Sequence, residues 1–202
     1  MQQDKIKFIN TFNQDADEIM IMSFLNNASL GSILKTNQGQ YFYITEEREQ
    51  TTMTEYSSVF IAFTVQRAPG NTLTIVPIAR ASTDEIFINY EPDTYYLATL
   101  LVDEDVRDMG VGSAIIQFLQ SVAAERNFKS FELNSTVRMR ISRFSEKCKV
   151  DANEYFYLKN GFTPIAYRNE ERSMTRFGRT VKESDKLKNK SSENEEEIIN
   201  GL

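Results

Sequence analysis

The pattern of apolar and polar positions predicts a run of strands through the middle of the chain. Val59–Val65 is apolar at nearly every position, as in a buried strand. Ala68-Pro69-Gly70-Asn71 is a turn signal, so Leu73–Ile78 is expected to pair with that strand as a hairpin. Pro77 has no N–H for a ladder, which predicts an edge or a bulge there. Two further candidate strands are Tyr41–Ile44 and Ile86–Ile88.

Two helices are expected before these strands. Asn13-Gln14-Asp15 precedes spaced apolar residues, and this acidic start predicts a helix beginning near Asp15. A second, short helix is predicted around Ser29–Lys35, before Gly39 interrupts the chain.

The second half of the chain has the pattern of alternating strands and helices. Tyr95–Val102 is almost entirely apolar or aromatic, which predicts a strand buried on both faces. An amphipathic helix ending near Glu125-Arg126-Asn127 is predicted because apolar residues follow the turn at helical spacing. These residues are Val111, Ala114, Ile115, Phe118, Leu119 and Val122.

The remaining elements complete the expected fold. Phe131–Leu133 predicts a short strand, and Ala152–Lys159 predicts a helix that Asn160-Gly161 terminates. Two final strands are expected at Phe162–Tyr167 and Arg172–Phe177. This order indicates a single α/β (α+β) domain over residues 1–177, with a mixed, mostly antiparallel sheet flanked by helices. Residues 178–202 are rich in Lys, Glu, Ser and Asn, so a charged, disordered tail is expected there.

Composition narrows the class of protein. The 202 residues are 41% hydrophobic and 26% charged, which is typical of a globular protein. No apolar run approaches the roughly 18 to 20 residues of a membrane span, and the start lacks the features of a signal peptide. The single cysteine, Cys148, fits a reducing compartment. We therefore expect a cytoplasmic protein with no membrane partner.

The absence of histidine excludes several chemistries. Ser-His and Cys-His nucleophile pairs and an imidazole base are ruled out, and with one cysteine no metal site is expected. Acid–base work must then fall to carboxylates, tyrosines, lysines or water. The net charge of −6 weighs against a nucleic-acid partner. It is compatible either with plain solubility or with a cationic partner such as an amine.

The segment Arg107-Asp108-Met109-Gly110-Val111-Gly112 lies between the predicted strand and the amphipathic helix. Exposed N–H groups and the helix dipole make such a turn a candidate anion site. Gly110 and Gly112 leave room for a phosphate, Arg107 adds positive charge and Ser113 offers a hydroxyl. The alternative is that the two glycines serve packing alone. The pattern is neither G-x-G-x-x-G nor a P-loop, which argues against a dinucleotide fold and an NTPase.

Two motifs in this order resemble those of a known family. Arg107-x-x-Gly110-x-Gly112 after an apolar strand resembles the pyrophosphate-binding motif of the GNAT superfamily of acyl-CoA N-acyltransferases. Tyr157-Leu158-Lys159-Asn160-Gly161-Phe162 is similar to the family's Tyr-x-x-x-Gly-Phe. The resemblance covers about residues 95–177 and includes the spacing of strands and helices.

The resemblance implies a binding mode for acetyl-CoA as co-substrate. Backbone groups of Leu100, Leu101 and Val102 would run beside the pantetheine, and an N–H near Leu100 would polarise the thioester carbonyl. Tyr157 would protonate the departing thiolate, although it is otherwise interpreted as a core aromatic. The pyrophosphate would lie on the turn, formed by Arg107, Asp108, Met109, Gly110, Val111, Gly112 and Ser113.

The base that deprotonates the amine is not identified by the resemblance. In several relatives a glutamate on the strand does this, and the matching position here is Tyr96. Glu91 is the candidate, acting through water, with Asp93 and Glu85 as neighbours; each is otherwise an ordinary loop carboxylate. A basic stretch within Asn134–Asp151 is interpreted either as an arm over phosphates or an acidic acceptor, or as a solvated insertion.

The sequence therefore predicts an N-acetyltransferase that moves an acetyl group directly from acetyl-CoA to a primary amine in a ternary complex. The acceptor, a small molecule or a protein, and the oligomeric state, with a homodimer among the alternatives, stay open. A second hypothesis is a CoA-binding sensor or interaction module without transfer activity. A third is a protein-acetylating or aminoacyl-tRNA-acetylating enzyme, of which the tRNA acceptor is disfavoured by the acidic charge.

Overall fold

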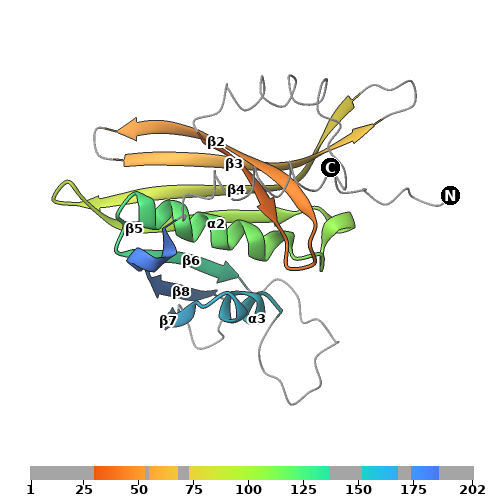
Figure 1. Cartoon of the computed structure of the whole chain (residues 1–202). Helices are drawn as coiled ribbons and strands as arrows, with labels where there is room; N and C mark the ends of the chain where they lie inside the picture. The colour runs from red at the N-terminus through yellow and green to blue at the C-terminus, as the bar shows by residue number, and fades with distance from the viewer. Residues whose placement is uncertain (1–29, 53–54, 68–72, 137–151, 168–173, 187–202) are drawn as a thin grey trace, which may run out of the picture.

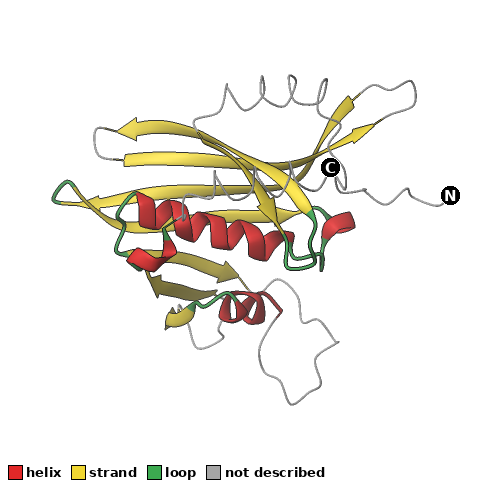
Figure 2. Ribbon diagram, in the orientation of Figure 1, coloured by secondary structure: helices red, strands yellow, loops and turns green. Residues whose placement is uncertain are grey.

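The computed structural model describes residues 30–52, 55–67, 73–136, 152–167 and 174–186. Eight strands form a single sheet in the order β1-β2-β3-β4-β5-β6-β8-β7, with α2 and α3 packed on it (Figures 1 and 2). The elements in chain order are β1 (Leu30–Lys35), β2 (Tyr41–Thr52), β3 (Glu55–Arg67), β4 (Leu73–Ile88), β5 (Glu91–Val102), η1 (Glu104–Val106), α2 (Val111–Glu125), β6 (Ser130–Thr136), α3 (Ala152–Lys159), β7 (Thr163–Tyr167), β8 (Met174–Thr180) and η2 (Glu183–Asp185).

The sheet is mixed and mostly antiparallel, as predicted. β1 to β5 form an antiparallel meander, α2 connects β5 to its parallel neighbour β6, and β8 inserts between β6 and β7. The predicted amphipathic helix is confirmed as α2, and the helix predicted at Ala152–Lys159 is confirmed as α3. The predicted bulge is also confirmed, because the β3–β4 register shifts where Phe63 pairs with Pro77.

The short helix predicted around Ser29–Lys35 is wrong, because Leu30–Lys35 forms β1. Its residues pair one by one with Tyr41–Glu46 across the turn at Thr36–Gln40. This hairpin supplies backbone hydrogen bonds that a short isolated helix could not retain in water. The helix predicted near Asp15 lies outside the described residues.

The core lies between α2 and one face of the sheet, which we call the helix face. Buried α2 side chains such as Ile115, Phe118 and Leu119 pack on it, and the Phe60 and Phe118 rings meet edge to face at 6.1 Å. Burial of each such side chain stabilises the fold by about 1.5 to 3 kcal/mol. The opposite, outer face is buried over β2 and β3, where Tyr43 stacks on Phe63.

β5 is not buried on both faces, which corrects the prediction for Tyr95–Val102. Tyr95 and Leu97 are buried, but the side chain of Leu101 is 63% exposed on the outer face. An apolar strand is covered on both sides only where both faces meet another layer. At this end of β5, the described residues cover the helix face alone, so exposed apolar surface remains.

The described fold extends beyond the domain boundary predicted at Phe177. β8 continues to Thr180, which pairs with Ser130 on β6, and η2 follows. The Val181 N–H donates to the Lys129 carbonyl at 3.0 Å, and Arg179 forms an ion pair with Asp185 at 2.9 Å. These contacts anchor residues that composition alone assigned to the tail. Residues 187–202 lie outside the described part of the chain.

An ion-pair network connects the C-terminal end of α2 to the sheet. Arg126, just after α2, contacts Glu46 at 2.5 Å and Glu85 at 2.7 Å, and both carboxylates are about 1% exposed. Arg48 also binds Glu85 through both of its oxygens, at 2.9 and 2.6 Å, and Ser58 donates to Glu46. Glu85 is therefore fully engaged by guanidinium groups and does not fit the role of a catalytic base suggested for it.

No helix in the described ranges is long and apolar enough to cross a membrane.

Candidate functional site

The turn between β5 and α2 has a strained, well-anchored backbone. Val106 in η1 is completely buried, and Asp103 caps η1 by accepting the Asp105 N–H at 2.9 Å. Asp108 and Gly110 both have positive φ, at 63° and 85°. The backbone thus bends sharply just before α2, which places the first turn of that helix at the surface.

Gly110 and Gly112 are required for different reasons. Gly110 is the N-cap in a left-handed conformation, and a Cβ there would lie 2.3 Å from Asn37 Oδ1. A Cβ on Gly112 would lie 3.2 Å from Phe156 Cζ and 3.6 Å from Val102 Cγ2. The alternative that the glycines serve packing therefore applies to Gly112, which lets α3 approach α2, and also to Gly110, which in addition has the left-handed conformation of the turn.

The first turn of α2 presents backbone donors for which the described part of the chain provides no acceptor. Ala114 N–H makes the first helical hydrogen bond, to the Gly110 carbonyl at 3.0 Å, which leaves the N–H groups of Val111, Gly112 and Ser113. Within the described residues no side chain caps this end, and the first turn holds no acidic residue. Three donors and the positive end of the helix dipole favour an anion here.

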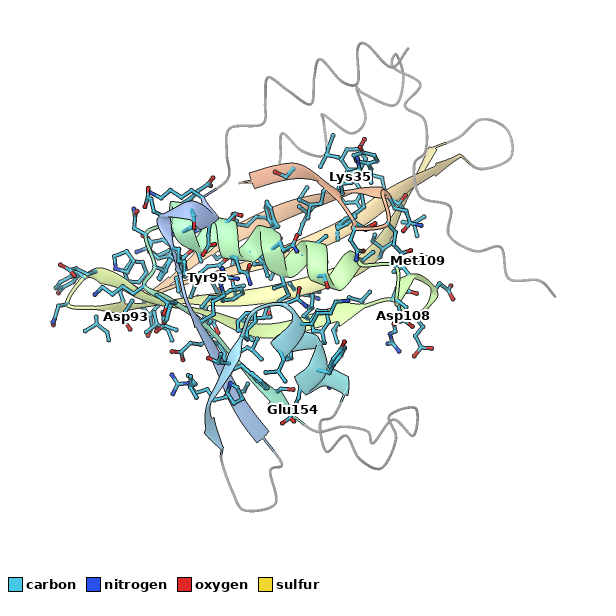
Figure 3. All side chains as sticks on the ribbon, turned by 60° about the horizontal axis from the view of Figure 1, so that its bottom comes forward. Lys35, Asp93, Tyr95, Asp108, Met109 and Glu154 are labelled. Carbon is cyan, nitrogen blue, oxygen red and sulfur yellow. The ribbon has the colours of Figure 1, made fainter. Side chains whose placement is uncertain are left out.

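A hollow of about 110 Å³ lies beside this helix end. Two lysines that the sequence analysis did not identify line it, Lys35 at the end of β1 and Lys159 at the end of α3. Figure 3 labels Lys35 on β1 and Met109 on the turn. Lys159 lies inside the Tyr-x-x-x-Gly-Phe motif, so the sequence could have indicated that it is near the site. Lys35 is placed near the site only by the β1–β2 hairpin, which the sequence did not predict. The lining residues are Lys35, Asn37, Gly110, Ser113, Ala114, Gln117, Lys159 and Asn160.

Arg107, Asp108 and Met109 of the turn each contact other parts of the protein. Arg107 is 58% exposed, forms an ion pair with Glu104 at 3.1 Å and donates to the Val102 carbonyl at 3.3 Å. The Asp108 carbonyl accepts from Gln38 Nε2 at 2.8 Å, and Met109 packs against the core. The turn therefore offers its backbone to a ligand more directly than its side chains.

β5 and β6 separate next to this turn. Their parallel ladder runs from Thr94↔Ser130 to Leu97↔Leu133 and has no further rung, although β5 continues to Val102 and β6 to Thr136. A bulge at Ala98 accompanies the separation, because Thr83 pairs with Leu97 and Ser82 with Thr99. No described strand pairs with β5 on the β6 side beyond Leu97. Leu100, Leu101 and Val102, the predicted pantetheine-binding residues, lie along this stretch.

Tyr157 on α3 lies in an aromatic cluster on the helix face. Its ring centroid is 5.2 Å from that of Phe156, 5.7 Å from Phe177 and 6.0 Å from Phe162. Burial raises the pKa of its phenol to about 12. The phenol therefore keeps its proton at neutral pH, and the surrounding rings show that Tyr157 also serves packing.

Asn160, directly after α3, is joined to α2 by hydrogen bonds. Asn160 Nδ2 donates to Ser113 Oγ at 3.3 Å, and Gln120 Nε2 donates to the Asn160 carbonyl at 3.2 Å. Gly161 follows with φ of 84°, which ends α3 as the sequence predicts. The two motifs, separated by some 45 residues, are thereby brought together at one place.

The structure does not bring Glu91 to this place. It is 75% exposed at the start of β5, where it lies 3.6 Å from Lys129. Nine residues of extended chain separate it from Leu100, or about 30 Å. Figure 3 shows neighbouring Asp93 at the opposite end of α2 from Asp108 and Met109. The structure therefore does not bring Glu91 or Asp93 together with the turn, and the assignment of Glu91 as base stays a prediction.

The basic stretch between the two motifs lies almost entirely outside the described residues. Only Asn134–Thr136 is described, as the end of β6, whereas 137–151, with Cys148, is not. Both interpretations of that stretch stay open.

Comparisons with known proteins identify the same family as the sequence motifs, and the match includes the first motif, Arg107–Gly112, but ends before the second. The sequence model of the Acetyltransferase (GNAT) family matches residues 33–145. Among solved structures, Ard1 from Thermoplasma volcanium is 22% identical, with 59% of this chain and 70% of that chain covered and a TM-score of 0.39. A GNAT family acetyltransferase from Elizabethkingia anophelis with acetyl-CoA bound is 12% identical, with coverages of 68% and 98% and a TM-score of 0.42.

A third similar structure is the NatC complex bound to Gag peptide and CoA. It is 16% identical, with 61% of this chain and 71% of that chain covered and a TM-score of 0.45. No curated protein sequence matches significantly. The family match spans more than half of the chain and includes the turn, α2 and the separation of β5 from β6. The chain therefore belongs to the GNAT family of acetyltransferases.

Proposed function

We propose that this protein transfers an acetyl group from acetyl-CoA directly to a primary amine, with both substrates bound together. The observation that carries the proposal is the separation of β5 from β6 beside the uncapped first turn of α2. The unpaired edge of β5 can form hydrogen bonds with the amides of pantetheine, and the first turn of α2 can bind a pyrophosphate.

The cofactor would lie across both parts. The pyrophosphate accepts hydrogen bonds from the N–H groups of Val111, Gly112 and Ser113 on the turn Arg107–Ser113. Lys35 and Lys159, which line the adjoining hollow, add positive charge. The pantetheine amides pair with the β6-facing backbone of Leu100, Leu101 and Val102, in place of the missing rungs of the ladder.

The chemistry then follows at the end of the ladder. The neutral amine attacks the thioester carbonyl carbon, and a β5 N–H near Leu100 stabilises the oxyanion. The C–S bond breaks, and the CoA thiolate leaves beside Tyr157. With a pKa of about 12 against about 8.5 for an ordinary thiol, the phenol is a weaker acid than the thiol it would form. Its first role is thus to donate a hydrogen bond to the thiolate, and full transfer of the proton needs a desolvated, more basic sulfur.

The test is an acetyl-CoA turnover assay across polyamines, amino acids, aminoglycosides and peptides. With an accepted amine, Tyr157→Phe is expected to lower kcat about tenfold or more and leave acetyl-CoA affinity unchanged. Tyr155→Phe is the matched control, since Tyr155 lies on the same helix but is 51% exposed. Equal turnover in the two variants would remove Tyr157 from the mechanism.

A CoA-binding module without transfer activity is the second candidate. It is favoured by Tyr96, which stands where several relatives have a catalytic glutamate. Acetyl-CoA binding by calorimetry, with no acetylated product from any acceptor, would support this candidate against the first.

A further inference from the structure

The route of the acceptor amine can be deduced from what covers each face at the end of the β5–β6 ladder. On the helix face this end is filled by core side chains, each at most 2% exposed. They are Tyr95, Leu97, Phe131, Leu133, Phe162 and Phe177. On the outer face the described neighbours Thr99, Leu101 and Asn134 are exposed. An amine can therefore reach a thioester held here only from the outer face.

Two ionisable side chains meet on that face at the end of the ladder. Tyr96 lies between buried Tyr95 and Leu97, so alternation directs it to the outer face, and the same argument applies to Glu132. The two are direct partners in the parallel ladder, one rung before its last pair. Neighbouring strands lie about 4.8 Å apart, so the carboxylate stands next to the position where relatives have their glutamate.

The Glu132 carboxylate is held by one oxygen and available through the other. Arg176 on β8 binds Oε2 with Nε at 2.8 Å and also with Nη2. Among the residues that the structure describes, Oε1 has one hydrogen-bond contact, from Ser130 Oγ at a long 3.5 Å. The side chain is 13% exposed. This orientation leaves a carboxylate oxygen free to accept a hydrogen bond from an incoming ammonium or water.

The other charged groups near Glu132 on this face belong to the flanking strands. Arg176 on β8 is the cation in contact, Tyr96 on β5 carries a phenol hydroxyl, and Asp84 on β4 lies beyond Tyr96. Gly178, the partner of Glu132 on β8, contributes no side chain, and the Ile165 side chain on β7 lies over it: a Cβ on Gly178 would be 3.0 Å from Ile165 Cδ1 and 3.5 Å from Glu132 Cγ.

We propose that Glu132 is the base that receives the proton of the acceptor amine. The proposal rests on the acetyl transfer proposed above. The carboxylate first binds the ammonium, directly or through one water, and its Oε1 takes one N–H proton, which passes to solvent across the exposed outer face. The nitrogen lone pair freed in this way forms the C–N bond, the C–S bond breaks, and the second N–H proton, now acidic on the acylated nitrogen, ends on the CoA sulfur. Atoms and charge balance without any further reactant.

The experiment compares Glu132→Gln with the wild-type protein, using an amine that the wild type acetylates. We expect kcat/KM for the amine to fall about 100-fold or more, with the KM for acetyl-CoA unchanged. Glu47→Gln is the matched control, because Glu47 is an exposed carboxylate on β2, separated from β6 by three strands. With an acceptor amine of pKa below 7, which is already neutral at the assay pH, the loss should shrink to less than threefold.

Two further variants separate the base from the ion pair. Arg176→Gln keeps the carboxylate and is expected to lose less than tenfold, and Glu132→Asp should retain part of the activity. Turnover by Glu132→Gln within threefold of wild type, or an equal loss in Arg176→Gln, overturns the assignment while acetyl transfer stands. Absence of turnover by the wild type with every acceptor overturns the proposed function and this assignment with it.

Discussion

The two ends of α2 differ in how their polar groups are satisfied. At the C-terminal end, Arg126 joins Glu46 and Glu85, and every charge has a partner in a nearly dry environment. At the N-terminal end, no side chain of the described ranges caps the three N–H groups, and two lysines line a hollow beside them. Buried charges must be paired to be tolerated, whereas exposed donors can be left for a ligand. The difference separates a structural end from a binding end.

The largest expected effect comes from breaking the structural end. Arg126→Ala leaves Glu46 buried without its guanidinium, and Glu85 with Arg48 alone. We expect the free energy of unfolding, from urea titration, to fall by about 3 to 5 kcal/mol. Arg107→Ala at the binding end removes only an exposed ion pair, and its stability should stay within about 0.5 kcal/mol of wild type. A loss below about 1 kcal/mol for Arg126→Ala would contradict the assignment of this network to stability.

Tyr157 is at the binding end but is buried like a structural residue. Its burial can be tested by measuring the free energy of unfolding at alkaline pH. Its pKa is about 12 in the fold and about 10 when unfolded. Below pH 10 Tyr157 is protonated in both the folded and the unfolded chain, so its contribution to the free energy of unfolding is fully present. As pH rises from about 10 to about 12, only the unfolded chain ionises, and about 2 to 3 kcal/mol of stability is lost. Tyr157→Phe should remove this part of the alkaline loss, as measured by unfolding at pH 9 and pH 12. An unchanged pH dependence would show that Tyr157 is not buried in solution.

Gly110 and Gly39 form a matched pair that tests the turn. Both have positive φ, but a Cβ at Gly39 meets nothing within 4 Å, whereas one at Gly110 meets Asn37. Either Gly→Ala change should cost about 1 to 2 kcal/mol of stability through backbone strain. Gly110→Ala alone should also weaken acetyl-CoA binding about tenfold in calorimetry, because the first turn of α2 must move. Equal affinities in the two variants would place the cofactor elsewhere.

The smallest expected effect ranks the cations around the anion site. Lys159→Ala should weaken acetyl-CoA binding about two- to fivefold, and less at high salt, because it lines the hollow at the helix end. Arg107→Ala should change affinity less, since its guanidinium already contacts Glu104 and the Val102 carbonyl. The reverse ranking in calorimetry at two salt concentrations would show that Arg107 turns towards the ligand.

Local patterns predicted the elements whose information is local. The spacing of apolar residues identified α2, and Gly161 marked the end of α3. The same method predicted a helix at Ser29–Lys35 because it could not detect the hairpin partner that makes β1 a strand. It also proposed Glu91 from its proximity in sequence, although an extended strand carries residues apart by more than 3 Å each.

The sequence by itself determined the order of elements from β2 onward, the glycine turn before α2 and the tyrosine motif after it, since each is a short-range pattern with its own chemistry. Only the tertiary structure decided which side chains share the site. The site combines three separate segments, which contribute Lys35, Lys159 and the turn. Tyr96 on β5 pairs with Glu132 on β6 in the parallel ladder, and α2 lies between these two strands in the sequence. Such contacts depend on strand register and helix packing, which arise from many distant residues at once and leave no mark in any one stretch of chain.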